Sequence, residues 1–270
     1  MSLTAETIWK LLTAVRERRP LVHNITNFVV MNNTANALLA LGASPAMVHS
    51  SDEVEDFVAI SQALVVNIGT LYSEQIAAAK LAAITARAQG IPWILDPVGA
   101  GATPYRRAAA EALARLGPTV IRGNGSEILA LAAGQAGRGK GVDSLDSAAA
   151  ALDGARQVAA GAGAAVAITG AVDYVTDGQR VTTIENGHPL MARVTGLGCS
   201  ATAVIGAFLA VERDAFTAAA AGLAVFGVAG EVAAERSPGP GSLQVALLDA
   251  LYGLDETRFI RQCRCREITP

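Results

Sequence analysis

The sequence predicts an α/β protein built on a mostly parallel central sheet that is flanked by helices. Short β-rich runs alternate with Ala-rich segments of helical periodicity, which is the order of βαβ units. Several of the runs are almost entirely apolar, as parallel strands buried on both faces are. We expect strands at residues 20–24, 45–49, 63–68, 93–96, 119–122 and 164–169. The dipeptide Asp177-Gly178 predicts a short antiparallel hairpin around residues 174–183.

Helices are expected between and after these strands. Several of them begin at a residue that can cap a helix or at a Pro. The expected helices span residues 4–18, 27–41, 73–89, 104–116, 125–133, 144–161, 198–211, 215–235 and 243–252. Because no linker or repeat divides the chain, we interpret residues 1–270 as one domain. The most apolar runs, 194–211 and 215–230, fall short of the ~20 residues that a bilayer requires, so we expect no membrane span.

The composition excludes several classes of protein. Hydrophobic residues make up 51% and charged residues 17% of the 270 positions, which indicates a folded core and not a disordered chain. The formal net charge is −3 and no basic stripe is visible, so we expect no nucleic-acid or membrane partner. Charged residues interrupt the N-terminal segment, which lacks the apolar core of a signal peptide, so we expect a cytoplasmic protein. Cys263 and Cys265 match neither a disulfide framework nor a zinc site.

Polar or Gly-rich segments follow most of the predicted strands. They occupy residues 23–27, 67–70, 96–101, 122–127 and 169–170. A single segment of this kind is explained by the turn that follows a strand. However, the carboxyl ends of parallel strands meet at one edge of a sheet, where α/β proteins bind their ligands. The convergence of all these segments therefore predicts a binding site at that edge.

Two carboxylates in these segments suit a divalent cation. Asp96 ends a predicted strand, and Glu127 lies in the first turn of a predicted helix. Oxygen ligands of this kind suit Mg²⁺, which keeps several of its waters in proteins. The spacing Asn124-x-x-Glu127 is also that of a capping box, so the pattern leaves both roles open for Glu127.

The segment at residues 194–201 is the sharpest signal in the chain. Gly196 and Gly198 precede a long apolar helix, so the amides of Gly196, Leu197, Gly198 and Cys199 are expected to form an anion hole for a phosphoryl group. The helix start favours the thiolate of Cys199, whereas a nearby phosphate favours the thiol, and the sequence leaves that balance open. The alternative is that Cys199 is a small buried hydrophobe, but its place directly after Gly-x-Gly favours a functional role.

Two other patterns are set aside. Residues 134–141 almost match a Walker A loop, but Gly141 replaces the Ser or Thr and the segment follows a helix, so we expect a surface loop. His23, His49 and His188 are too scattered to form a metal site, and no hydrolase triad accompanies them.

Taken together, six segments resemble those of the hydroxyethylthiazole kinase family, and they span most of the chain. They are residues 21–27, 40–47, 67–71, 94–104, 121–124 and 194–199, which include NIGTL, ILDPVGAGATP and VTGLGC. The resemblance implies a ribokinase-like three-layer sandwich. It also implies ATP-dependent phosphorylation of the hydroxyl of 4-methyl-5-(2-hydroxyethyl)thiazole in thiamine salvage, by a homotrimer with active sites between subunits.

The resemblance further implies which residues bind the two substrates. Asn27 and Met47 would contact the thiazole, and Gly196 would lie close to its hydroxyethyl arm. Arg122 and Thr169 would bind ATP.

It also implies a metal and a candidate base. Asp96 and Glu127 would hold Mg²⁺, and Cys199 would stand where most ribokinase-like kinases have an aspartate base.

Two alternative functions remain open. A pyrimidine or sugar kinase of the same fold is expected to carry Asp in place of Cys199, and a non-catalytic nucleotide sensor would bind ATP without turning it over.

Overall fold

The described residues form one nine-stranded sheet. The computed structural model describes residues 3–135 and 148–268, and within them the strands lie in the order β2-β1-β3-β4-β5-β6-β7-β8-β9. The strands are β1 (Leu21–Ile25), β2 (Ser44–Ala46), β3 (Ala63–Asn67), β4 (Trp93–Asp96), β5 (Val120–Asn124), β6 (Ala165–Thr169), β7 (Asp173–Thr176), β8 (Val181–Ile184) and β9 (Cys265–Ile268). Strands β1 to β6 pair with one another in parallel. The pairs β6–β7, β7–β8 and β8–β9 are antiparallel. The predicted mostly parallel sheet is thereby confirmed.

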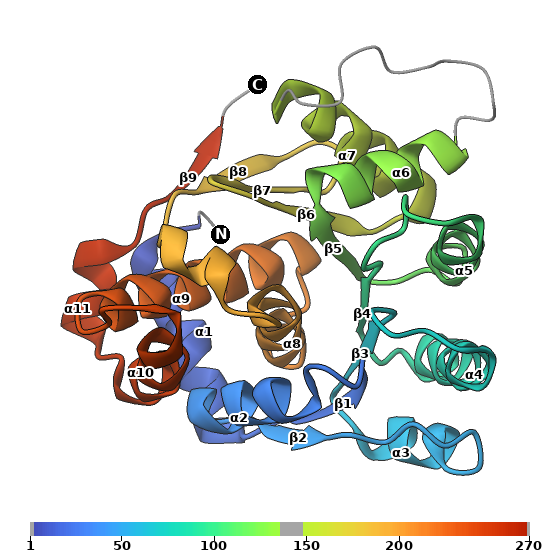
Figure 1. Ribbon diagram of the computed structural model, residues 1–270, viewed down its shortest axis with the longest axis horizontal. Coiled ribbons are helices and arrows are strands. Elements are labelled where there is room, and N and C mark those ends of the chain that lie inside the picture. Colours follow the sequence, from blue (N-terminus) through green and yellow to red (C-terminus); the bar gives the residue numbers. More distant parts are fainter. Residues whose placement is uncertain (1–2, 136–147, 269–270) are drawn as a thin grey trace.

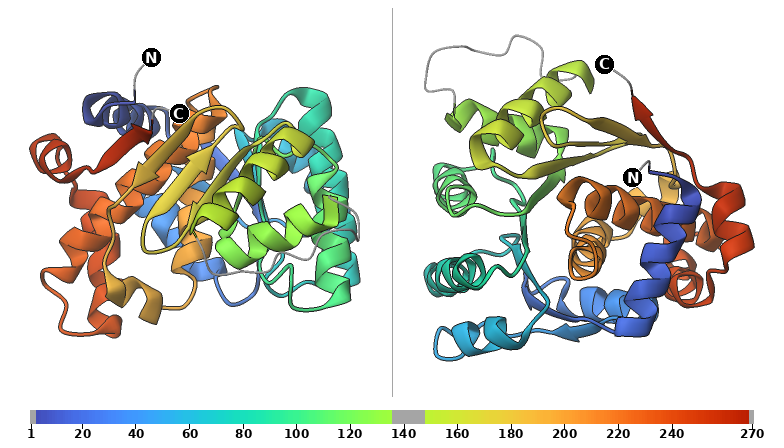
Figure 2. Two further views of the ribbon diagram at one scale, coloured as in Figure 1. Left: turned by 90° about the horizontal axis from the view of Figure 1, so that it is seen from above. Right: turned by 180° about the vertical axis from the view of Figure 1, so that it is seen from behind.

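Helices cover both faces of the sheet and complete three layers (Figure 1). One layer comprises α3 (Val54–Ile60), α4 (Ser73–Gln89), α5 (Pro104–Ala114), α6 (Gly125–Gln135) and α7 (Ala148–Ala162). The other comprises α1 (Ala5–Arg18), α2 (Met31–Leu41), α8 (Leu197–Leu209), α9 (Ala215–Ala234), α10 (Pro240–Gly253) and α11 (Glu256–Gln262). Figure 2 shows α1 and α11 side by side although they lie near opposite ends of the chain. Each layer buries its own apolar cluster against the sheet.

The predicted elements occur with shifted boundaries. The expected hairpin is the β7–β8 pair, and the helix expected from residue 27 begins at Met31 because residues 26–30 form the loop after β1. Helices α3 and α11, strand β9 and a short 3₁₀ helix at Pro189–Arg193 were not predicted. Most of the expected loop at 134–141, and the first residues of the helix expected at 144–161, lie outside the described residues.

Helix α9 is a core helix. It is long and apolar enough to cross a bilayer, but most of its residues are buried inside the fold, so burial accounts for its composition. Gly222 allows close packing in this layer, because a Cβ there would come within 2.9 Å of the Cα of Ile205 in α8. Gly206 brings α8 equally close to the sheet, because its Cβ would meet Val65 of β3 at 2.8 Å. This packing fixes where the N-terminus of α8 lies.

Candidate active site

Polar side chains from neighbouring strands meet at the carboxyl edge of the sheet, as the sequence predicts. Asn67 and Asp96 are register partners at the ends of β3 and β4. Asn27 follows β1, and its Nδ2 donates to Oδ1 of Asn67 over 2.8 Å. Asn67 in turn donates from Nδ2 to Oδ2 of Asp96 over 2.8 Å. All three side chains are almost fully buried, so they form an ordered polar chain beneath the edge.

The N-terminus of α8 faces this chain. Gly196 is the N-cap with φ 82°, and a Cβ there would come within 2.6 Å of Val30, so the position requires glycine. The first hydrogen bond of the helix runs from Ser200 N to Gly196 O over 2.9 Å. The amides of Leu197, Gly198 and Cys199 precede it and therefore have no acceptor within the helix. Such amides favour an anion, which supports the predicted anion hole.

Arg122 connects the helix start to two neighbouring strands. Its Nη2 donates to Oγ1 of Thr169 at the end of β6 over 2.6 Å. Its Nη1 lies 3.8 Å from Oδ2 of Asp96. A Cβ on Gly198 would come within 2.9 Å of the same Nη1, so the guanidinium packs directly on the first turn of α8. A cation and a helix N-terminus thus act on the same region, where both attract phosphate.

Cys199 lies in the first turn of α8 and is half-buried. Burial raises its pKa to about 11, and the nearby charge of Asp96 adds to that increase. Hydrogen bonds from Asn67 and Asn27 and the charge of Arg122 act in the opposite direction but do not outweigh burial. The Nδ2 of Asn27 lies 3.6 Å from the Cys199 sulfur. Burial therefore favours the thiol of Cys199 over its thiolate.

The two carboxylate oxygens of Asp96 differ in their hydrogen bonds. Oδ2 accepts from Asn67 and from Oγ1 of Thr202, the latter over 2.7 Å. Oδ1 is buried, and it has no hydrogen-bond partner among the described residues. Burial raises the pKa of Asp96 to about 6; Arg122 lowers it and the charge of Glu127 raises it. A buried carboxylate oxygen without a partner fits a water or a hydrated cation.

Glu127 forms the capping box that the sequence spacing allows. Its Oε2 accepts from the Asn124 N–H over 2.8 Å, and its own N–H donates to Oδ1 of Asn124 over 2.9 Å. Its Oε1 accepts from the Gly99 N–H over 2.8 Å, which ties the loop after β4 to α6. No cluster of three or more His, Cys, Asp or Glu side chains within residues 3–135 and 148–268 is placed to chelate a metal directly. The donor set instead fits Mg²⁺ that retains waters and touches one or two carboxylates.

Met47 lies at the far end of the same edge. It directly follows β2, whose last residue, Ala46, is the register partner of His23 in β1. The side chain is half-buried. Met47 therefore lies at the same carboxyl edge as the other predicted residues, after the outermost strand β2.

Three further residues of this edge had no predicted role. Thr202 lies one helical turn after Gly198, and a Thr in so apolar a helix is the signal that could have identified it. Arg106 donates to the backbone carbonyls of Ile68, Val98 and Gly69 over 2.9, 2.9 and 2.8 Å. Its signal is a cation in the first turn of a helix, where a cation is unfavourable.

Asp173 at the start of β7 is the third. Its Oδ1 accepts from the Gly170 N–H over 2.9 Å. Burial raises its pKa to about 6, while the Gly170 hydrogen bond and the charge of Arg122 lower it. Asp173 is thus an acidic neighbour of Arg122 that the strand pattern did not reveal.

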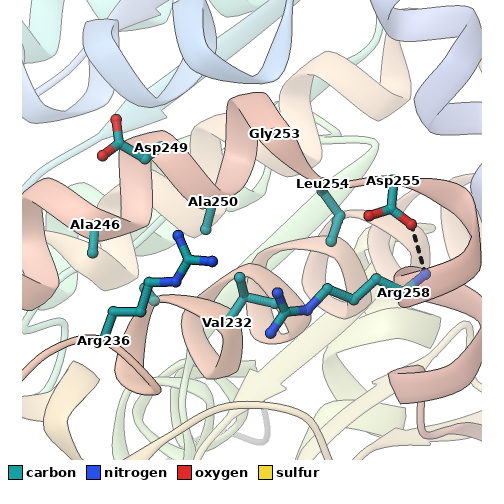
Figure 3. A pocket seen from close by; sticks show the side chains of 10 residues that line it. Val232, Arg236, Ala246, Asp249, Ala250, Gly253, Leu254, Asp255 and Arg258 are labelled. Carbon is teal, nitrogen blue, oxygen red and sulfur yellow. Dashed lines mark hydrogen bonds between the residues drawn. The ribbon is translucent and has the colours of Figure 1, made fainter.

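A separate cavity of about 180 Å³ lies between α9, α10 and the start of α11 (Figure 3). Arg236 and Arg258 reach toward it, and Arg258 is already paired with Glu235. None of its lining residues belongs to the carboxyl edge.

The chain is similar to known proteins over most of its length. Residues 12–257 match the model of the hydroxyethylthiazole kinase family. The hydroxyethylthiazole kinase of Granulibacter bethesdensis is 60% identical over 253 residues, which cover 94% of this chain and 92% of that protein.

Solved structures agree at the level of the fold as well. The structure of the hydroxyethylthiazole kinase from Pyrococcus horikoshii superposes with a TM-score of 0.91 at 44% identity, covering 98% of this chain and 100% of that one. A ribokinase-like superfamily protein from Enterococcus faecalis, at 15% identity and a TM-score of 0.61, covers 86% of both chains and shares the fold alone. With its ribokinase-like fold and its match over nearly the whole length, the chain belongs to the hydroxyethylthiazole kinase family.

Proposed function

We propose that this member of the family transfers the γ-phosphoryl group of ATP to the hydroxyl of 4-methyl-5-(2-hydroxyethyl)thiazole at the carboxyl edge, as a step in thiamine biosynthesis. The observation that carries the proposal is the packing of the Arg122 guanidinium on Gly198 at the start of α8. Phosphoryl transfer requires mainly positioning and neutralisation of charge. An arginine and a helix N-terminus that act on one point meet that requirement.

On the nucleotide side, we assign ATP to Arg122 and Thr169. The hydrogen bond between them holds the guanidinium at the mouth of the anion hole. The amides of Leu197, Gly198 and Cys199 would then receive the transferring phosphoryl group.

We further propose that Asp96 and Glu127 hold Mg²⁺. The partnerless Oδ1 of Asp96 and the charge of Glu127 beside it support this assignment. The cation would neutralise charge on the ATP phosphates. Because Glu127 also binds the Gly99 and Asn124 amides, we expect it to act on the metal through retained waters.

On the alcohol side, we assign the thiazole to Asn27 and Met47, with its hydroxyethyl arm near Gly196. The Cys199 sulfur lies 3.6 Å from Nδ2 of Asn27, and its amide belongs to the first turn of α8, so we assign Cys199 as the catalytic residue that faces the hydroxyl. Because its pKa is about 11, only a small thiolate fraction is available at neutral pH, so its contribution as a base is limited.

Exposed apolar side chains beside the edge support the homotrimer as part of this proposal. Phe28 and Tyr72 stack with their ring centroids 5.6 Å apart, and Phe28 is 61% exposed. Val29 next to them is also exposed. Covering such a group of side chains is favourable, and a partner subunit here would close the site. Light scattering should give three times the chain mass.

A coupled ADP-release assay tests the proposed reaction. We expect ADP to form only when the thiazole alcohol is present, and a pyrimidine alcohol or a sugar to react much more slowly. Preference for one of those alternatives would assign the protein to a related kinase. ATP binding without turnover of any alcohol would indicate a nucleotide sensor. The reaction needs a compartment supplied with ATP, and we propose the cytoplasm.

A further inference from the structure

The buried chain of side chains behind the site has a fixed direction. Asn27 donates to Asn67, and Asn67 donates to Asp96, each over 2.8 Å. Asn27, Asn67 and Asp96 come from three adjacent strands, β1, β3 and β4, or from the loop directly after the strand. Their exposed fractions are 3%, 1% and 0%, so water does not compete for these hydrogen bonds.

Two backbone N–H groups determine how the Asn67 and Asn27 side-chain amides are oriented. The backbone N–H of Gly69 donates to Oδ1 of Asn67 over 2.9 Å, and the N–H of Val29 donates to Oδ1 of Asn27 over 3.1 Å. A backbone N–H can only donate, so each amide must present its oxygen there and its nitrogen elsewhere. A rotated Asn27 amide would place its oxygen against Oδ1 of Asn67 and its nitrogen against the Val29 N–H.

The orientation of the Asn27 amide determines which atoms it can offer to a ligand next to Cys199. One N–H of Asn27 is used by Asn67, and the other points toward the sulfur of Cys199 at 3.6 Å, which is a weak contact. An incoming ligand can replace the sulfur only by offering an acceptor atom. Gly69 supports this arrangement, because a Cβ there would come within 2.5 Å of Nδ2 of Asn27.

We propose that Asn67 is a positioning residue that holds the Asn27 amide as a hydrogen-bond donor, so that the alcohol substrate is recognised through an acceptor atom. This inference rests on the proposed function and deepens it. Asn67 acts through Asn27 and need not touch the substrate. Because Asn67 also donates to Asp96, a proposed Mg²⁺ ligand, both KM values are measured at saturating Mg²⁺. Under that condition the effect should fall on the alcohol and not on ATP, whose own proposed contacts are Arg122 and Thr169.

Substitution of Asn67 by Leu tests the role. Asn67→Leu removes the acceptor for Asn27 and frees its amide to rotate. We expect the KM for the thiazole alcohol to rise about tenfold, as the loss of one well-placed hydrogen bond predicts, while the KM for ATP stays within twofold. Asn67→Thr keeps one hydroxyl that can accept from Asn27 and donate to Asp96, and it should recover part of the loss.

Asn186 provides a matched control. It is also a buried Asn with both amide ends engaged, since Nδ2 donates to the Gln262 carbonyl over 2.8 Å and Oδ1 accepts from the Arg264 N–H over 2.7 Å. Asn186→Leu should lower the melting temperature as Asn67→Leu does, with both KM values unchanged. An Asn67→Leu protein that behaves like this control, or that loses alcohol and ATP affinity together, would overturn the proposal.

A measurement on the unsubstituted protein covers the case in which Asn67→Leu does not fold. With ¹⁵N-labelled Asn, the side-chain N–H₂ signal of Asn27, assigned by its loss in Asn27→Ser, should shift on addition of the thiazole alcohol. An unchanged signal at saturating alcohol would contradict the donor role. Failure of the proposed function would be seen differently, as absence of turnover by the wild type.

Discussion

The guanidinium of Arg122 lies against the backbone of Gly198, so closely that a Cβ at position 198 would come within 2.9 Å of Nη1 and 3.0 Å of Nη2. Gly198 in the first turn of α8 and Arg122 within β5 therefore depend on each other. Their proximity brings a positive side chain and the helix N-terminus to one point, and the account of ATP binding rests on it.

Gly198→Ala tests that contact directly. The added methyl should displace the Arg122 guanidinium and break its hydrogen bond to Thr169, so the KM for ATP should rise about tenfold for the loss of one charged hydrogen bond. The helix preference of Ala over Gly, about 1 kcal/mol, should offset part of the stability that is lost with that hydrogen bond.

Gly241→Ala in the first turn of α10 is the control, since a Cβ there meets no atom within 4 Å. It should leave the kinetics unchanged. Equal KM values for ATP in the two Ala variants would show that Arg122 does not bind the nucleotide from this position.

Cys199→Ala and Cys199→Asp separate a base from a residue that only fills space. If Cys199 takes the hydroxyl proton, the Ala variant should bind both substrates and turn over ~10²–10⁴ times more slowly. The wild-type rate should rise from pH 7 to pH 9, because burial raises the thiol pKa to about 11. The Asp variant should be active and less dependent on pH. An Asp variant as slow as the Ala variant, in folded protein that binds ATP, would exclude the base role.

Mg²⁺ dependence tests the two carboxylates. Asp96→Asn and Glu127→Gln should each raise the Mg²⁺ concentration needed for half-maximal rate, because each removes a charge near the cation. Glu127→Gln should also lower the unfolding free energy by about 1 kcal/mol, since a neutral amide replaces the carboxylate in the capping box. Wild-type rates at limiting Mg²⁺ in both variants would refute the metal assignment.

Asp173→Asn should change how stability depends on pH. The folded pKa of Asp173 is about 6, whereas the ordinary pKa of an Asp side chain is 3.8, so between these pH values the folded state binds more protons than the unfolded state. The contribution of Asp173 is therefore fully present below pH 3.8 and is lost as the pH rises through about 6. The free energy of unfolding of Asp173→Asn relative to wild type should rise over this window by about 3 kcal/mol at most, at ~1.4 kcal/mol per pKa unit. Parallel urea-unfolding profiles for the two proteins from pH 4 to pH 7 would contradict the buried acid.

The sequence predicts much of the fold because its strongest signals are local. A run such as residues 63–66 is apolar and fully buried, and the Gly-rich or Asn-rich residues after each run mark the carboxyl edge. Strand β9 could not be found in this way. Its residues are largely exposed, and it is a strand only because it pairs with β8, which lies about 80 residues earlier. Helix α3 is only seven residues long, too short for a clear period.

The sequence places several candidate residues on one edge of the sheet, but it does not give their contacts. The strand ends place Asn27, Arg122 and Asp96 on one edge, and the structure brings them together. The spacing Asn124-x-x-Glu127 cannot distinguish a cap from a metal ligand, and only the structure shows the cap. The pKa of Cys199 depends on burial by distant parts of the chain, which no local pattern contains.

The product of the reaction tests the central claim most directly. Wild-type protein, ATP, Mg²⁺ and the thiazole alcohol are followed together by ³¹P NMR, with mass spectrometry of the alcohol. The account predicts ADP and a phosphate monoester of the alcohol in equal amounts, and neither when the alcohol is left out. ADP accompanied only by inorganic phosphate, or an alcohol recovered unmodified, would contradict phosphoryl transfer at this site.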